Sequence, residues 1–214
     1  MLDLTSLEGD VALELAEFER PPLGPLELLA AWIKQAQGLR VREPLAITLA
    51  TVDRAYDVST RIVLMKALDE RGLLFTTHHG SRKGRDLAEV ARASATFYWR
   101  ETLQQVSVAG PVERLSDREA DELFRSRPRA AQATTAASEQ SGTFAEDDSA
   151  AKLKGRAEAL ADAGASIERP AEWGGYRLLA ERVEFWHGSP DRLHRRLEYR
   201  LGGAGEWTHR RLQP

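Results

Sequence analysis

The sequence contains no cysteine. Disulfide bonds, thiolate metal ligands and a cysteine nucleophile are therefore excluded, and the absence fits a reducing compartment. Histidine is also scarce, and a nucleophile-elbow signature is missing. The five histidines, which show no metal-ligand spacing, are His78, His79, His187, His194 and His209. We therefore expect no bound metal.

The chain also lacks a basic excess and a long apolar run. Its 30 Lys and Arg residues stand against 33 Asp and Glu, which gives a net charge of −3 and does not favour a nucleic-acid partner. The longest apolar run, residues 28–33, is too short to span a bilayer, so no membrane partner is expected. The first residues have neither the basic region nor the apolar stretch of a signal peptide. These features predict a soluble, cytoplasmic protein.

With 214 residues, of which 42% are hydrophobic and 29% charged, the chain is long enough for one substantial globular domain. Residues 1–24 are acidic and weakly patterned, and we expect them to form a partly mobile N-terminal segment. The proline-rich stretch 21–25 is a rigid turn. No internal repeat is seen, so residues 25–214 are expected to form a single domain.

The first half of that domain changes from helical to strand periodicity. Apolar residues at helical spacing predict an amphipathic helix over residues 26–36, ended by Gly38. Short β-branched or aromatic segments then predict strands over residues 46–52, 60–68, 72–77, 93–99 and 104–113. One helix, over residues 81–91, interrupts them. This arrangement predicts a mostly antiparallel sheet or barrel.

The second half mixes helices and strands. A capping-box pattern at Ser116 predicts a helix whose buried side carries Ala120, Leu123 and Phe124. Small and polar residues predict a long loop over residues 130–148, and helical spacing returns over residues 150–163. Three final strands are expected over residues 176–186, 192–199 and 207–212. The expected class is mostly β with flanking helices (α+β).

The segment from Gly80 to Leu87 is the strongest candidate for an anion site. It lies between a predicted strand and a predicted helix, where free backbone N–H groups suit a phosphate. Ser81 adds a hydroxyl donor, and Arg82 and Lys83 add positive charge. Its glycines fit neither a Walker loop nor a dinucleotide fingerprint. A solvated basic helix start would have the same sequence.

A second candidate is the strand that contains Arg61 and Lys66. Two cations within an apolar strand are costly to bury without an anion, although both could instead extend to solvent at a sheet edge. Five residues apart, they face opposite sides of a regular strand. Unless the strand is bulged, they serve two different groups.

Other polar residues could contact a heterocycle. Gln105 follows Gln104 into a strand, so one amide faces each side, and Gln140 with Ser141 offers similar chemistry in the polar loop. Near the chain end, an aromatic residue, a histidine and several arginines gather between residues 183 and 196. A core tryptophan beside a basic outer strand would explain that last group equally well.

Taken in order, these segments resemble the pyridoxamine/pyridoxine 5′-phosphate oxidase family over residues 25–214. The matching stretches are Arg61-Ile62-Val63-Leu64-Met65-Lys66, Phe75-Thr76-Thr77, Ser81-Arg82-Lys83, Gln105-Val106, Arg127-Pro128-Arg129, Gln140-Ser141, Trp173-Gly174-Gly175-Tyr176, Glu184-Phe185-Trp186, Arg192-Leu193-His194 and Arg211-Leu212-Gln213-Pro214. The resemblance implies an FMN-binding split β-barrel with flanking helices. It also implies a homodimer with two FMN sites between its subunits.

The resemblance assigns roles by matching position. Arg61, Ser81, Arg82 and Lys83 would hold the flavin phosphate, and Gln105 would face the flavin ring. The full implied cofactor set is Arg61, Ile62, Val63, Leu64, Lys66, Thr76, Thr77, Ser81, Arg82, Lys83, Gln105, Gln140, Ser141, Trp186 and Arg196. The implied substrate set is Lys66, Leu123, Arg127, Ala131, Arg192 and His194. Of these, Arg192 and His194 are the candidates for catalysis, and His194 could relay a proton.

The substrate side departs from the vitamin enzymes of the family. In those enzymes a tyrosine and a serine help hold the substrate phosphate, but this chain has Leu123 and Ala131 there. Further stretches resemble the flavin oxidases of phenazine biosynthesis, namely Thr77-His78, Gly80-Ser81, Lys83-Gly84-Arg85, Tyr98-Trp99-Arg100-Glu101-Thr102, Gln104-Gln105 and Arg210-Arg211-Leu212-Gln213-Pro214. Lys66 and residues 173–176 favour the vitamin enzymes.

The favoured function is dehydrogenation of a reduced, carboxylated phenazine precursor, with dioxygen reoxidising FMN. A pyridoxine/pyridoxamine 5′-phosphate oxidase is the first alternative, and a non-catalytic flavin- or haem-binding split barrel is the second. The sequence leaves open which small aromatic substrate is used, which oxidation step is performed, and how the N-terminal segment and the 130–148 loop are arranged.

Overall fold

The computed structural model describes Gly9 and residues 13–214. The expectation of a partly mobile segment over residues 1–24 therefore falls in part on residues outside the description, 1–8 and 10–12. The remainder of that segment includes a short 3-10 helix, η1 (Ala16–Phe18). Leu15 and Phe18 are buried in the hydrophobic core, so this stretch packs against the body of the protein.

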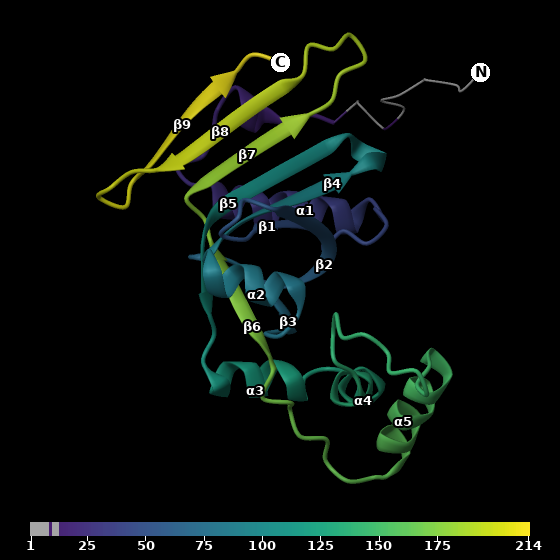
Figure 1. Cartoon of the computed structure of the whole chain (residues 1–214). Coiled ribbons are helices and arrows are strands. Elements are labelled where there is room, and N and C mark those ends of the chain that lie inside the picture. The colour runs from purple at the N-terminus through teal and green to yellow at the C-terminus, as the bar shows by residue number, and fades with distance from the viewer. Residues whose placement is uncertain (1–8, 10–12) are drawn as a thin grey trace, which may run out of the picture.

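Nine antiparallel strands form one sheet in the order β4-β1-β2-β3-β6-β5-β7-β8-β9 (Figure 1). Because β4 also pairs with β5, the first six strands close into a barrel, and β7, β8 and β9 extend from it. The strands are β1 (Ala46–Val52), β2 (Val58–Asp69), β3 (Gly72–His78), β4 (Arg92–Trp99), β5 (Gln104–Arg114), β6 (Trp173–Leu179), β7 (Arg182–His187), β8 (Arg195–Leu201) and β9 (Trp207–Leu212). The barrel and its extension share β5.

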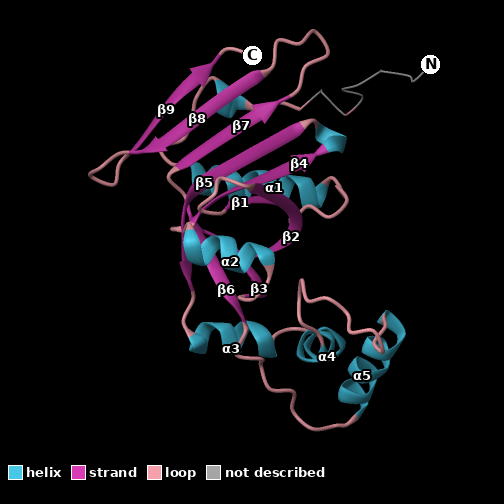
Figure 2. Ribbon diagram, in the orientation of Figure 1, coloured by secondary structure: helices cyan, strands magenta, loops and turns pink. Residues whose placement is uncertain are grey.

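The helices lie around this sheet (Figure 2). They are α1 (Pro25–Gly38), α2 (Arg82–Glu89), α3 (Asp117–Arg125), α4 (Arg129–Ala137) and α5 (Ala150–Asp162), with a short 3-10 turn, η2 (Arg100–Thr102). Trp32 of α1 is buried and meets the ring of Phe185 edge-on at 5.0 Å. The prediction of a mostly β fold with flanking helices is confirmed. None of the helices within the described residues is both long and apolar enough to cross a membrane.

The 130–148 segment differs from its expectation. Its first part is helical, because α4 spans Arg129–Ala137. Alanine is the strongest helix former, and this stretch buries Ala133 and Thr135, whereas the loop prediction followed from small and polar composition alone. Residues 138–149 are the remaining loop. In Figure 1, α4 and α5 lie together at one end of the molecule, away from the strand extension.

The predicted strand over residues 176–186 is instead two strands. β6 pairs with the end of β5, at Val112 to Arg114, and β7 pairs with its beginning, at Gln104 to Ala109. The chain bends between them, where the backbone N–H of Glu181 donates to the carbonyl of Ala109. The predicted strand over residues 192–199 begins only at Arg195, because Arg192 has a left-handed φ of 68°.

Candidate functional site

The start of α2 is a capped helix end that follows β3 directly. Ser81 is its N-cap, accepting from the backbone N–H of Gly84 and donating to the carbonyl of His78 at 2.7 Å. A Cβ at Gly84 would lie 2.2 Å from the carbonyl of His79, so only glycine allows the helix to approach the preceding turn this closely. The N-terminus of α2, with its partial positive charge, therefore lies beside the end of β3.

Lys83 is buried at this helix start, with 6% of its surface exposed. Its Nζ donates to Thr77 Oγ1 at 3.1 Å, Ser81 Oγ at 3.2 Å and Gln140 Oε1 at 3.1 Å. All three acceptors are neutral. Burial, together with the positive charge of Arg61, lowers the Lys83 pKa to about 8. A buried ammonium group of this kind would be stabilised by an incoming anion.

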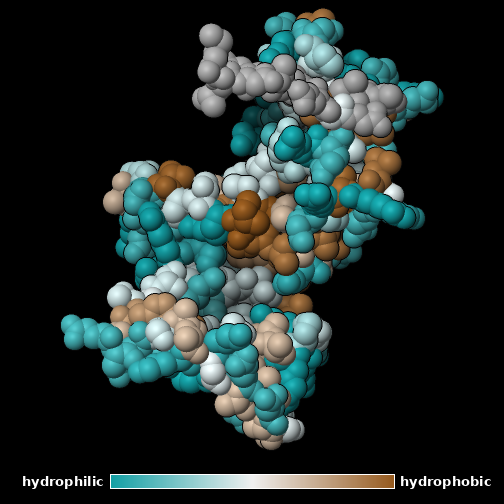
Figure 3. Space-filling view, turned by 90° about the vertical axis from the view of Figure 1, so that its right-hand side faces the viewer, coloured by the Kyte–Doolittle hydropathy of each residue, from teal (hydrophilic) through white to brown (hydrophobic). Residues whose placement is uncertain are grey.

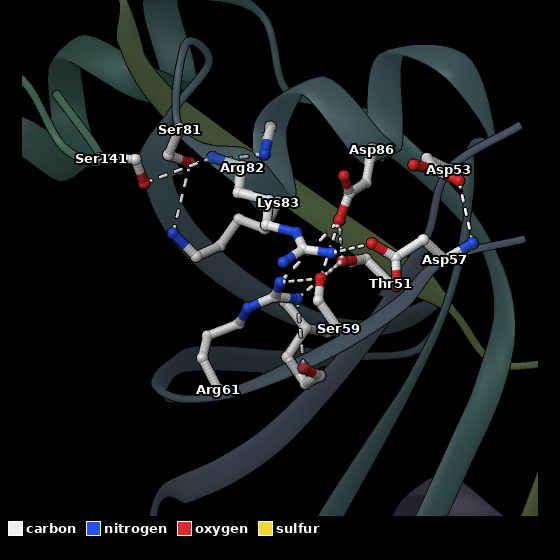
Figure 4. A network of polar contacts seen from close by, with 12 residues as sticks. Thr51, Asp53, Asp57, Ser59, Arg61, Ser81, Arg82, Lys83, Asp86 and Ser141 are labelled. Carbon is white, nitrogen blue, oxygen red and sulfur yellow. Dashed lines mark hydrogen bonds and ion pairs between the residues drawn. The ribbon is translucent and has the colours of Figure 1, made fainter. Parts of the chain in front are cut away.

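Arg61, on β2, brings a second cation to the same place (Figure 4). Its Nη1 donates to Thr51 Oγ1 at 2.6 Å and its Nη2 to Ser59 Oγ at 2.5 Å. Burial lowers the Arg61 pKa, and nearby Asp86 partly opposes this effect. Arg82 adds a third positive charge at the surface, where it pairs with Asp57 at 2.7 Å. Three cations and a helix N-terminus therefore converge on one small region, an arrangement suited to a phosphate.

The loop after α4 contributes to this cluster. Gln140 Oε1 accepts from both Lys83 and Thr77, and Ser141 Oγ accepts from the backbone N–H of Arg82 at 3.4 Å. Thr76 precedes Thr77 on β3 and therefore faces the other side of the strand. The residues predicted to hold the phosphate thus lie together on β2 and at the start of α2, and Thr77, Gln140 and Ser141 contact them.

The rest of β2 follows the predicted alternation. Ile62, Leu64 and Lys66 are exposed on one side, whereas Arg61 and Val63 lie on the more buried side. The register shifts between Met65 and Ala67, so Lys66 sits at a bulge. Arg61 nevertheless lies on the more buried face of this strand and Lys66 on the exposed face. Lys66 is therefore not part of the Arg61 cluster.

A second group of predicted residues lies on the strand extension. Gln105 pairs in register with Trp186 on β7, and Trp186 pairs with Arg196 on β8, so the three form one row across the sheet. The ring of His194 lies 4.8 Å from that of Trp186. Arg196 is held by Glu184 at 2.7 Å and by the carbonyl of Gln213 at 3.1 Å. This row offers an aromatic face beside amide and guanidinium donors.

A third group surrounds Arg127, between α3 and α4. Its guanidinium lies 5.0 Å from the ring of Trp173 and donates to Thr135 Oγ1 at 2.6 Å, and burial lowers its pKa. Leu123 and Ala131, on α3 and α4, are both half-buried. Burial lowers the pKa of His78, and the charges of Lys83 and Arg127 lower it further, so this group and the phosphate cluster are within electrostatic reach of each other.

Three polar residues of the phosphate cluster were missed by the sequence reasoning: Thr51, Ser59 and Asp86. Asp86 is buried and accepts hydrogen bonds from the other two. A usable signal was present, because Asp86 follows Lys83 by three residues and so shares its helix face. The two hydroxyls lie on neighbouring strands, paired at Thr51 with Ser59, and only the fold brings them to Asp86.

Comparison with known proteins agrees with this geometry. Residues 33–158 match the family described as "Pyridoxamine 5'-phosphate oxidase", and residues 173–214 match the "Pyridoxine 5'-phosphate oxidase C-terminal dimerisation region". A dihydrophenazinedicarboxylate synthase of Burkholderia lata is 40% identical over 209 residues, covering 98% of this chain and 97% of that protein. A pyridoxine/pyridoxamine 5′-phosphate oxidase of Ralstonia pickettii is 43% identical over 215 residues, covering 100% of both.

A solved structure is also similar over nearly the whole chain. PhzG from Burkholderia lata, in complex with tetrahydrophenazine-1-carboxylic acid, superposes with a TM-score of 0.91 at 39% identity, covering 96% of this chain and 100% of that one. The similarity spans both the barrel and the strand extension. The expected family, and with it the expectation of an oxidoreductase, is confirmed: the chain belongs to the pyridoxamine 5′-phosphate oxidase family.

Proposed function

We propose that this protein is an FMN-dependent oxidase that dehydrogenates a reduced, carboxylated phenazine precursor. The observation that carries the cofactor assignment is the buried Lys83, whose hydrogen-bond partners are all neutral, beside Arg61 and the N-terminus of α2. Such a site suits the single terminal phosphate of FMN. Bound FMN would take up two electrons from the substrate and pass them to dioxygen.

The residues of the strand extension would serve the ring end of the cofactor. Gln105 would donate to the edge of the flavin ring, and Trp186 and Arg196 would close the site over it. The hydrogen bonds of Arg196 go to Glu184 and Gln213 in the C-terminal part of the chain, whereas the phosphate cluster lies on β2, β3 and α2. Two half-sites in one chain are what a homodimer needs if each cofactor is shared between subunits.

The dimer has further support. Residues 173–214 match a dimerisation region, and this range contains β6 to β9. Large hydrophobic side chains are also exposed on the outside of the barrel, at Val58, Ile62, Leu64 and Tyr98. Figure 3 shows an apolar area in the middle of one face of the molecule. Apolar patches rimmed by polar residues commonly mark protein–protein contacts.

The substrate assignment depends on Leu123 and Ala131. Both stand where the vitamin enzymes of the family place hydroxyl donors to the substrate phosphate. Each missing hydrogen bond to a phosphate would weaken vitamin binding by about 1–3 kcal/mol. The apolar replacements suit a flat aromatic ring, and Arg127 nearby would attract its carboxylate. The similar PhzG structure contains a tetrahydrophenazine carboxylic acid, which favours the same class of substrate.

On the other side of the substrate, Arg192 and His194 would contact the reacting ring. His194 lies against Trp186, and its Nδ1 accepts from the backbone N–H of Ser189 at 3.1 Å. This bond leaves Nε2 as the protonated ring nitrogen in the neutral tautomer. His194 would therefore present Nε2 for a hydrogen bond or a proton transfer.

Anaerobic stopped-flow mixing tests the substrate directly. The flavin-loaded enzyme should be reduced faster by a dihydro- or tetrahydrophenazine carboxylate than by pyridoxine 5′-phosphate. Heat release followed by chromatography should identify the cofactor as FMN, at one per chain. Release of FAD, or of no flavin, would refute the cofactor assignment whatever the substrate.

The alternative is a pyridoxine/pyridoxamine 5′-phosphate oxidase, favoured by the 43% identity to the Ralstonia pickettii enzyme. Efficient formation of pyridoxal 5′-phosphate, without reduction by phenazines, would establish it instead. The double variant Leu123→Tyr/Ala131→Ser should raise turnover of pyridoxine 5′-phosphate by about tenfold or more, because it restores two hydroxyl donors. No gain would place substrate selection outside these two positions.

A further inference from the structure

Asp86 is a buried carboxylate directly behind the guanidinium of Arg61 (Figure 4). Only 6% of its surface is exposed. Its Oδ2 accepts from Thr51 Oγ1 at 2.6 Å and from Ser59 Oγ at 3.0 Å, and lies 3.8 Å from Arg61 Nη2. A carboxylate this buried is costly unless it is paired and hydrogen-bonded, so the partners of Asp86 form a defined arrangement.

The two hydroxyls connect Asp86 to Arg61. Each hydroxyl has one proton, and donating it to Asp86 leaves the oxygen lone pairs for Arg61. Thr51 Oγ1 then accepts from Nη1 at 2.6 Å, and Ser59 Oγ accepts from Nη2 at 2.5 Å. Asp86 thereby fixes the direction of both hydroxyls, and the hydroxyls fix the end of the guanidinium.

This arrangement determines which side of Arg61 can bind a ligand. A guanidinium has five N–H groups. Both on Nη1 are used, by Thr51 and by the carbonyl of Leu49 at 3.3 Å, and one on Nη2 is used by Ser59. The Nε–H and the second Nη2–H make no hydrogen bond within the part of the chain that the structure describes. These two adjacent groups form the fork that binds two oxygens of one phosphate.

We propose that Asp86 is a positioning residue that holds this fork toward the phosphate of the flavin. The role rests on the proposed FMN site and deepens it. Asp86 makes the site selective for a phosphorylated flavin over riboflavin, because only the phosphate uses the fork. Lys83, in the first turn of α2, and the N-terminus of that helix would face the same phosphate.

The positioning role of Asp86 and the effect of its negative charge predict opposite changes in FMN affinity for Asp86→Asn. The variant removes a negative charge near a phosphate, which by itself would tighten FMN binding. Both hydroxyls donate to the same oxygen, Oδ2, and the amide oxygen that would take its place is a weaker acceptor than a charged carboxylate oxygen. Both hydroxyls are then held less firmly, and so is the guanidinium of Arg61. If positioning dominates, binding weakens.

The test compares FMN with riboflavin by quenching of flavin fluorescence. We expect Asp86→Asn to raise the FMN Kd by about tenfold or more, with the riboflavin Kd changed less than about twofold. The matched control is Asp57→Asn, because Asp57 is a carboxylate in the same network whose pair with Arg82 is exposed. The control should leave both constants within about twofold.

The outcomes separate the two proposals. If the wild type does not bind FMN, the proposed function fails and this role fails with it. If the wild type binds FMN and Asp86→Asn binds it equally or more tightly, only the role of Asp86 is overturned. Equal losses for FMN and riboflavin would show a structural role and would also overturn it. If Asp86→Asn yields no folded protein, Ser59→Ala provides the test, because it removes one of the two hydroxyls between Asp86 and Arg61 and keeps the buried carboxylate. A selective loss of FMN binding would support the role of Asp86, and unchanged FMN binding would refute it.

Discussion

The two parts of the candidate site are built in different ways. The phosphate cluster draws its hydrogen-bonding groups from Leu49 to Asp86, with Gln140 added from a loop. The ring row runs from Gln105 to Gln213 and depends on the register of β5, β7 and β8. The first part is built from one turn, one helix start and the pairing of β1 with β2, which are close in the sequence, whereas the second exists only once strands that are distant in the sequence have paired.

The two parts of the site therefore have different roles, one in binding the cofactor and the other in enclosing it when the subunits pair. The phosphate cluster has its cations, its helix cap and its buried counter-charge within one chain. The ring row provides contacts but no phosphate site. A cofactor bound only by the first part would be held at one end. We therefore expect the phosphate cluster to set whether FMN binds, and subunit pairing to set whether the bound flavin is enclosed.

The largest effect is expected from the phosphate cluster. Lys83→Ala should raise the FMN Kd by at least about 100-fold, because it removes a buried charge from the phosphate site, and Arg61→Ala should act similarly. Arg85→Ala is the matched control, since Arg85 is an exposed cation on the same helix that donates to the carbonyl of Gly80. Equilibrium dialysis measures all three. Retention of flavin by both cluster variants would mean that the phosphate lies elsewhere.

Mixed dimers test whether the two parts meet across subunits. Lys83→Ala and Arg196→Ala break different halves of each site if the halves come from different chains. Random mixing of the two variants makes half of the particles heterodimers, and each heterodimer has one intact site. Substrate turnover, which needs both halves of a site, should therefore return to about a quarter of the wild-type rate. Mixing that restores no turnover would place both halves in one subunit. Light scattering should show twice the 23.8 kDa chain mass.

The pH dependence of FMN binding tests whether Lys83 of the phosphate cluster binds the phosphate. The Lys83 pKa is lowered to about 8 in the free protein, and a bound phosphate raises it. A group whose pKa rises on binding favours the complex at low pH, so affinity should fall by up to about tenfold per unit above pH 8. The phosphate itself loses a negative charge below about pH 6. Affinity should therefore peak between these limits. Riboflavin, which has no phosphate, should show no such decline, and an equal decline would exclude Lys83 as its cause.

The sequence predicted the parts of the molecule that depend on local chemistry. The capping box at Ser116 occurs as expected, because two side chains and the backbone within four residues suffice to form it. The Asp86 network escaped prediction because its two hydroxyls reach it only through the pairing of β1 with β2. The helix α4 escaped because a run of small residues can form either a helix or a loop, and burial of Ala133 and Thr135 decides between them.

The smallest effect is expected at Gln140, which the 138–149 loop adds to the phosphate cluster. In the free chain its Oε1 accepts from Lys83 and Thr77, at 3.1 and 2.8 Å, so it occupies donors that a phosphate oxygen would use. Its side chain is exposed, and water can replace these bonds at little cost. Gln140→Ala should therefore speed FMN association, because no displacement is needed. It should also speed dissociation, because the amide no longer covers the bound cofactor.

These two changes oppose each other in the equilibrium constant. The Kd should change by less than about threefold, while both rate constants rise. Stopped-flow fluorescence resolves the two rates. Ser141→Ala is the neighbouring control, since its hydroxyl accepts a long bond of 3.4 Å from the backbone of Arg82 and blocks no side-chain donor of the cluster. A slower association in Gln140→Ala would show that this amide guides the phosphate into place. A faster dissociation without faster association would show that it acts only on the bound ring, which would assign the loop to the ring half of the site.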